Sequence, residues 1–325
     1  MRKNFAGLVI SSLSLLILLT ATDSRAHHPS ATSGTGQSGP IRTVSAETLP
    51  QGNWFLSFRA EYLDLDSFTD NELMAHAAGG TDVHSVDSIM HTSLGLGYGV
   101  TDDLTLSLTI PYIHLANIRE SHSDEPDEVH LHGDSNGFGD LTLSGQYRFL
   151  NSREQGLQSS LTFGIKTPTG RTTEKDIEGE RFETEFQPGS GSWDPIVGLS
   201  VSKRLSSFSL DADVQCTFAT EGAQDVNLGD KLDYDLALSY RIPGQRLSWD
   251  LVVELNGEWK GKQEQGGTKD PNSGGNSVFL SPGLRATGEA GWSVFLSVGF
   301  PVVQNLNGVQ NEVNTRTTFG ISYMF

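Results

Sequence analysis

The stretch that decides the fold is Leu232-Asp233-Tyr234-Asp235-Leu236-Ala237-Leu238-Ser239-Tyr240. Leucine and tyrosine occupy every second position, and the residues between them are acidic or small. Because successive side chains of a β-strand point to opposite faces, this pattern predicts a strand with one apolar and one polar face. Aspartates repeated along the second face indicate that this face meets water or charged partners, and not a hydrophobic core.

The same alternation occurs twelve times along the chain and predicts twelve strands of about ten residues each. Their apolar faces span residues 54–62, 90–98, 104–112, 141–149, 157–165, 197–201, 208–218, 232–240, 247–259, 278–284, 292–300 and 317–325. Short turns and long segments alternate strictly between these strands. The long segments are 64–87, 122–137, 168–192, 219–230, 261–276 and 304–312, which would place all of them at one end of an up-and-down meander.

A soluble β-sandwich also has alternating strands, but four features favour a membrane barrel over it. These are an export signal, strands long enough to cross a bilayer when tilted, the strict alternation of connections, and aromatic residues such as Trp54, Tyr98 and Trp259 near strand ends. A closed barrel also satisfies every backbone group in lipid. We therefore predict an all-β fold for residues 53–325, a transmembrane up-and-down antiparallel β-barrel of twelve strands.

The residues before the barrel divide into two segments. Residues 1–26 have a basic start, an apolar stretch and the small residues of a cleavage site, so they are expected to be a cleaved signal peptide. Residues 27–52 are rich in Ser, Thr and Gly and predict a flexible leader, which either hangs in the periplasm or enters the lumen as a small plug. Cleavage removes three basic residues and one acidic residue, and the formal net charge changes from −18 to −20.

The end of the sequence and its overall charge indicate the partners. Residues 319–325 place an aromatic or aliphatic side chain at every second position and finish on Phe325. This segment looks like the signature read by the outer-membrane barrel assembly machinery, so a Gram-negative outer membrane and its lipids are the expected surroundings. An acidic chain repels phosphate backbones, so nucleic-acid binding is not expected. A single cysteine excludes a disulfide framework, and no cofactor is expected.

If the apolar faces meet lipid, the alternate residues line the lumen. Strands between residues 208 and 259 would supply an acidic wall, opposed by basic residues from elsewhere on the circumference, with four arginines near the periplasmic mouth. Such charges either line a conducting path and set its ion preference or form a salt-bridge lattice that fills a narrow barrel. The candidate residues are Arg59, Arg148, Lys166, Arg204, Asp211, Asp213, Asp233, Asp235, Arg241, Asp250, Glu254, Arg285 and Arg316.

All nine histidines lie between His27 and His132, and five of them fall in or beside the first two long segments among many acidic residues. Imidazole and carboxylate groups suit zinc, copper or nickel, but a solvated acidic loop with incidental histidines has the same composition. The candidate metal ligands are His76, His84, His122, His130 and His132.

Catalysis is not expected. The nearest candidate is His91 with Ser93, but alternation places both on the lumen face, whereas hydrolysis of phospholipid needs a site facing lipid. The chain also contains no G-x-S-x-G motif.

Four stretches carry a family resemblance, namely GPIRTVSAETLP at 39–50, DVHS at 82–85, YGVTDDL at 98–104 and GDSNGFGD at 133–140. They resemble a family of outer-membrane transporters named for an association with the meta-cleavage pathway of phenol degradation. The resemblance implies a barrel that passes, or helps to pass, small molecules, without identifying the solute. The expected function is a passive channel or transporter component for small solutes, including aromatic or other hydrophobic compounds. The alternative is a surface barrel that binds metal or ligand through its first two long loops.

Overall fold

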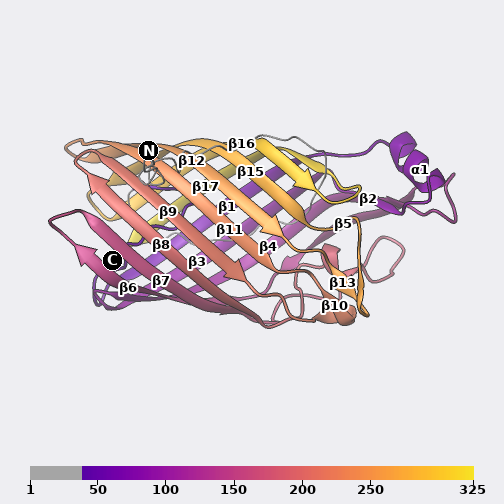
Figure 1. The fold of residues 1–325 in the computed structure, drawn as a ribbon, viewed down its shortest axis with the longest axis horizontal. Coiled ribbons are helices and arrows are strands. Elements are labelled where there is room, and N and C mark those ends of the chain that lie inside the picture. The colour runs from indigo at the N-terminus through magenta and orange to yellow at the C-terminus, as the bar shows by residue number, and fades with distance from the viewer. Residues whose placement is uncertain (1–38) are drawn as a thin grey trace, which may run out of the picture.

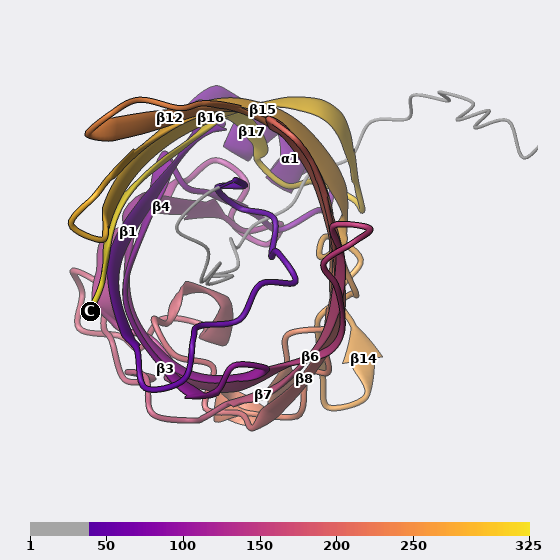
Figure 2. The ribbon, with the colours of Figure 1, turned by 90° about the vertical axis from the view of Figure 1, so that its left-hand side faces the viewer.

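The computed structural model describes residues 39–325; the predicted signal peptide, residues 1–26, and residues 27–38 of the leader lie outside the described residues. Twelve long antiparallel strands form a barrel that is seen from the side in Figure 1 and along its axis in Figure 2. The strands are β1 (Trp54–Asp66), β3 (Ser88–Thr101), β4 (Leu104–Ser121), β6 (Thr142–Ser152), β7 (Leu157–Lys166), β8 (Asp194–Leu205), β9 (Phe208–Thr217), β11 (Lys231–Ile242), β12 (Leu247–Lys260), β15 (Gly275–Gly288), β16 (Trp292–Leu306) and β17 (Glu312–Met324).

The ring closes between its first and last strands. Strand β1 pairs with β17 from Phe55 opposite Met324 to Asp66 opposite Glu312, and with β3 on its other side. Every other barrel strand pairs with its two neighbours in sequence order. All twelve predicted strands are present, and the predicted fold class is confirmed. No helix within residues 39–325 is long and apolar enough to span a membrane.

The faces of the barrel wall follow the alternation predicted from the sequence. Along β11, Leu236 and Leu238 are 44% and 50% exposed, whereas Asp235 and Ala237 on the opposite face are buried. Apolar side chains therefore cover the outside of the barrel, and polar ones fill the inside. This distribution of side chains is the reverse of that in a soluble protein. It suits a barrel in lipid, where the outside meets hydrocarbon and the inside holds water or polar partners.

The two ends of the barrel differ. The short turns lie at the end where the described chain enters, at the left of Figure 1, and the long segments project from the other end. In outer-membrane barrels short turns face the periplasm and long loops face outward. At the short-turn end the rings of Trp54 and Tyr98 are 4.7 Å apart, and those of Phe208 and Tyr240 are 4.8 Å apart, as interfacial aromatic residues would be placed.

The long segments hold more regular structure than the sequence predicts. The segment expected to be a loop over 122–137 is the end of a hairpin, because β4 extends to Ser121 and pairs with β5 (His130–Phe138). In β5 one set of alternate positions holds His130, His132, Asp134 and Asn136, and the other holds mostly glycine and serine, so β5 lacks the continuous apolar face that marks the other strands. The remaining elements are α1 (Asp70–Ala78), β2 (Val83–Ser85), η1 (Thr184–Phe186), η2 (Ala223–Asp225), β10 (Val226–Asn227), β13 (Glu264–Gln265) and β14 (Thr268–Lys269).

Candidate functional site

Residues 39–49, here called the lumen segment, run through the inside of the barrel. Figure 2 shows this indigo stretch crossing the ring before it turns into β1. The segment forms no strand ladder, so its backbone groups need other partners. Residues 39–46 and Leu49 are buried. The sequence left open whether the leader enters the lumen, and the described part of it does so.

Carboxylates of the acidic wall accept the backbone N–H groups of the lumen segment. Glu254, fully buried on β12, accepts hydrogen bonds from the amides of Ile41, Arg42 and Thr43 at 3.0–3.1 Å. Asp213 on β9 accepts the amide of Val44 at 2.7 Å. One buried anion bound by three successive amides is a backbone nest, in which the side chain of the wall is the anion.

Hydroxyl groups continue this pattern farther along the segment. Ser202 on β8 accepts the amide of Ala46, and Thr105 on β4 accepts the amide of Leu49, each at 2.8 Å. Contacts from β4, β8, β9 and β12 thus hold the segment across the full width of the barrel.

Basic and amide side chains bind the carbonyl groups of the same segment. Arg285 donates to the carbonyl of Pro40 at 2.5 Å, Arg59 to that of Ile41 at 3.1 Å, and Gln146 to that of Ser45 at 2.6 Å. The aliphatic side chain of Ile41 also packs with Val252 and Phe295 in a small buried cluster. The wall therefore recognises both the polarity and the shape of the segment.

The segment also brings charges of its own. Arg42 is 4% exposed and forms an ion pair with Glu61 on β1 at 2.6 Å. Near the short-turn end, Glu47 forms an ion pair with Arg204 at 2.8 Å. Arg42 thus places a cation beside the acidic wall, and its ion pair offsets part of the cost of burying these carboxylates.

Nine of the thirteen predicted lumen residues are buried inside the barrel. They are Arg59, Asp211, Asp213, Asp233, Asp235, Asp250, Glu254, Arg285 and Arg316. The other four lie nearer the ends and are ion-paired, Arg148 with Asp103, Lys166 with Asp194, Arg204 with Asp211 and Arg241 with Asp250. Inward orientation is a fact of the structure, whereas contact with a passing solute stays a prediction.

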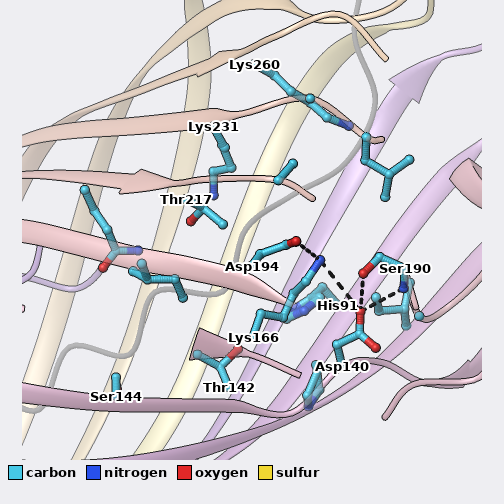
Figure 3. Close-up of a pocket in the computed structure, with 18 of the residues that line it drawn as sticks. His91, Asp140, Thr142, Ser144, Lys166, Ser190, Asp194, Thr217, Lys231 and Lys260 are labelled. Carbon is cyan, nitrogen blue, oxygen red and sulfur yellow. Dashed lines mark hydrogen bonds and ion pairs between the residues drawn. The ribbon is translucent and has the colours of Figure 1, made fainter. Parts of the chain in front are cut away.

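A cavity of about 250 Å³ lies between the lumen segment and the long-loop end. Its lining combines apolar groups such as Val44, Ile113 and Ile196 with the cationic side chains of Lys166, Lys231 and Lys260. Figure 3 shows Lys166 between two carboxylates, Asp194 at 2.5 Å and Asp140 at 3.7 Å. Ser190, from the long segment after β7, donates to Asp140 at 2.6 Å and so ties this loop to the cavity.

Apolar side chains close part of the lumen beyond this cavity. Phe182 and Phe186 from the segment between β7 and β8 fold inward and pack on inward-facing residues of the barrel strands. This outer apolar cluster comprises Leu63, Leu65, Val86, Ile89, Leu115, Ile118, Phe182, Phe186, Phe279 and Val313. The strand pattern did not predict this cluster, although the apolar residues Leu63 and Leu65 on the polar face of the first strand were a signal for it.

Three of the predicted histidines converge on one carboxylate outside the barrel, at the long-loop end. Glu120 Oε1 lies 2.8 Å from His84 Nε2 and 3.2 Å from His122 Nδ1, and Glu120 Oε2 lies 3.2 Å from His132 Nε2. We call these four residues the histidine cluster. Of the other two candidates, His130 lies beside it, with its ring 5.3 Å from that of His122, whereas His76 on α1 contacts Phe68.

The charges around the histidine cluster shift its titrations. Burial alone would lower the pKa of His84, but contact with Glu120 and the charges of Glu185 and Glu183 outweigh it and raise the pKa to about 9. Burial would raise the pKa of Glu120, but the imidazoles of His132 and His84 hold it well below its usual range. The carboxylates in and around the cluster thus favour positive charge on its imidazoles.

Comparisons with known proteins agree with this architecture. Residues 75–305 match the model of a family described as "Putative MetA-pathway of phenol degradation". No curated protein matches the sequence. An outer membrane channel from Pseudomonas putida F1 is similar in structure, with a TM-score of 0.64 at 18% sequence identity, covering 88% of this chain and 100% of that chain. The CymD monoaromatic hydrocarbon channel gives a TM-score of 0.41 at 12% identity, covering 85% and 88%.

The family match and the fold therefore coincide, since the matched residues run from α1 through β16 and take in most of the barrel. The likeness to the Pseudomonas channel is one of fold. Because the family model matches more than half of the chain, the protein belongs to the family described by the MetA-pathway of phenol degradation.

Proposed function

We propose that the protein is an outer-membrane channel for small solutes whose lumen the segment of residues 39–49 keeps shut. The observation that carries this proposal is that side chains of the lumen wall, and no β-ladder, bind the backbone of the segment. Water can replace such contacts one at a time, because each hydrogen bond contributes only about 0.5–3 kcal/mol net. The lumen segment can therefore leave the lumen while the strand pairing of the barrel wall stays intact.

The volume of the cavity favours a solute of about the size of a single aromatic ring. Its volume of about 250 Å³ is small for a ligand pocket, and its lining combines apolar side chains with three lysines and the carboxylates of Asp140 and Asp194. Membership of a family described by phenol degradation favours aromatic compounds within this size class. We infer that the protein carries such solutes without transforming them, and that it reaches the outer membrane after cleavage of residues 1–26.

A single substitution tests the closed state. Glu254→Gln keeps the size of the side chain but removes the charge that binds three amides. A hydrogen bond to a charged group contributes about 1.5–3 kcal/mol, and 1.4 kcal/mol corresponds to tenfold in an equilibrium. We therefore expect the open fraction in planar-bilayer recordings to rise about tenfold or more.

The matched control is Glu289→Gln, the same chemical change on an exposed short turn. It is expected to leave the recordings unchanged. Equal open fractions for Glu254→Gln and the unchanged protein would contradict a closing role for the lumen segment.

We also infer that the assembly machinery of the outer membrane reads residues 319–325. The side chain of Phe325 is exposed, while its backbone pairs with Trp54 through two hydrogen bonds of 2.8 and 3.0 Å. Phe325→Ser keeps both bonds, so we expect the refolded barrel to unfold at nearly the same temperature, whereas its yield in the outer membrane of living cells falls severalfold. Met324→Ser is the control. Equal yields of the two variants would exclude recognition of Phe325.

A further inference from the structure

We propose that Glu120, His84, His122 and His132 bind a divalent transition-metal ion of the class of zinc, copper or nickel. These residues come from three elements and one turn at the long-loop end, namely β2, the end of β4, the turn after it, and β5. They lie above the outer apolar cluster, with the rings of His84 and His132 5.0 and 6.3 Å from those of Phe186 and Phe182. The proposal is independent of whether the barrel conducts.

Each imidazole of the histidine cluster places one nitrogen close to the same carboxylate. Metal ligands lie at about 2.0–2.2 Å from zinc, so two ligand atoms of a tetrahedral site are about 3.4 Å apart. In the histidine cluster the three contacts between imidazole nitrogen and carboxylate oxygen measure 2.8, 3.2 and 3.2 Å. The imidazole nitrogens now surround Glu120, and the side chains would rotate towards one another for a single ion to contact all of them.

The nitrogen atoms themselves favour a ligand. The Nε2 atoms of His84 and His132 are buried from solvent and make no hydrogen bond of acceptable geometry, although both lie close to Glu120. Buried polar atoms of native proteins nearly always have a partner. A cation between these imidazoles and the carboxylate would satisfy both of them.

Further carboxylates lie next to the imidazoles of the cluster, as they do around the ligands of metal sites. His132 Nδ1 lies 2.9 Å from Asp176, and a carboxylate on the second nitrogen of an imidazole orients it as a metal ligand. Glu183 and Glu185 approach His84 at 3.8 and 3.7 Å, and the ligand atoms of these three residues all lie within 4.8 Å of one another. Glu185 offers a carboxylate oxygen at Nδ1 of this imidazole, and Glu183 offers one near the Nε2 atom that also faces Glu120.

An ion would have a route to these residues. Asp82, His84, Glu120, His122, Glu183 and Glu185 line one side of an open cleft of about 750 Å³ at the long-loop end. Lys269 is the cationic residue that shares the lining with them, so the described groups around the cleft are mostly anionic. Mixed imidazole and carboxylate ligands distinguish this place from an ordinary acidic surface, because imidazole suits zinc, copper and nickel more than calcium or magnesium.

The test is metal binding to the full-length mature protein, purified without a histidine tag and stripped with EDTA. Calorimetry with Zn²⁺ and the visible absorption of Co²⁺ are expected to show one ion per chain, with the intense bands of a site that contains nitrogen ligands. Losing even an outer-shell partner of a metal site costs about 10- to 100-fold in affinity. Glu120→Gln is therefore expected to weaken Zn²⁺ binding by at least about tenfold.

The controls separate this site from general attraction of cations. His122→Gln is a second test variant on a partly exposed side chain, and folding of each variant is checked by its heat-dependent migration on gels. His76→Gln, which changes a histidine outside the cluster, is expected to bind Zn²⁺ like the unchanged protein. No Zn²⁺ binding at micromolar concentration, equal binding by all three variants, or Ca²⁺ binding as tight as Zn²⁺ would each overturn the proposal.

Discussion

Deleting residues 39–49 is expected to raise the single-channel conductance of the protein severalfold in planar bilayers. The deletion removes the chain that crosses the lumen and leaves the twelve-stranded ladder intact, because the lumen segment contributes no strand pairing. It also exposes Glu254, Asp213 and Glu61 to the lumen without the amides and the arginine that they now bind. Carboxylates that line a pore select for cations, so the reversal potential in a salt gradient is expected to move towards the equilibrium potential of the cation.

The control for this deletion is Gln51→Ala, which changes an exposed side chain at the short-turn end and keeps the segment in place. Its conductance is expected to match that of the unchanged protein. A deletion variant with unchanged conductance and unchanged selectivity would mean that Phe182, Phe186 and the rest of the outer apolar cluster close the lumen without help from residues 39–49.

The wall of the barrel could be predicted from the sequence because a two-residue period is a local signal. Leu236 and Asp235 are neighbours in the chain, and their opposite environments follow from strand geometry alone. The apolar pattern does not define the strand ends, and β4 extends nine residues beyond Tyr112, the last residue of its predicted apolar face. Its outer part projects beyond the lipid, so the apolar signal ends before the strand does.

The contents of the lumen could not be predicted in the same way. The bonds between Glu254 and Ile41 join residues separated by 213 positions, and an extended segment held by side chains has no period of its own. Arg42 was the local signal that residues 39–49 could enter the lumen, because its positive charge complements the acidic wall. The charged side chains of the wall face inward, as alternation predicts, but their contact with a solute stays a prediction. The sequence left open whether the leader enters the lumen and could not identify which of its groups bind the wall.

The long-loop end held signals that the sequence analysis did not use. Thr69 and Glu72 form a capping box at the start of α1, in which the Thr69 side chain accepts from the amide of Glu72 and the Glu72 side chain accepts from that of Thr69. The histidine cluster depends instead on the pairing of β4 with β2 and β5, which brings residues 84, 120 and 132 together. The composition of the loops indicated imidazole and carboxylate groups as candidate metal ligands. Which three of the five candidate histidines lie together around Glu120 depends on the strand register.

Leu236→Arg is expected to destabilise the barrel in lipid vesicles by about 2–4 kcal/mol, the cost of an arginine facing lipid near the bilayer midplane. Leu236 lies halfway along β11 on the outer face, where it is 44% exposed. Its neighbours in the ladder are Leu255 and Ala212, so an arginine there has no acidic partner across either strand. Reversible urea unfolding in vesicles, followed by tryptophan fluorescence, measures the free energy of unfolding.

The matched control is Leu131→Arg, because Leu131 on β5 is 49% exposed and so presents nearly the same area. It pairs with Arg119 at the long-loop end, beyond the apolar belt, where the same arginine meets water. Its cost is expected to stay within about 0.5 kcal/mol, as for most surface substitutions. If the two variants lost equal stability, exposed area alone would determine the effect, and the apolar belt of this barrel would not be facing lipid.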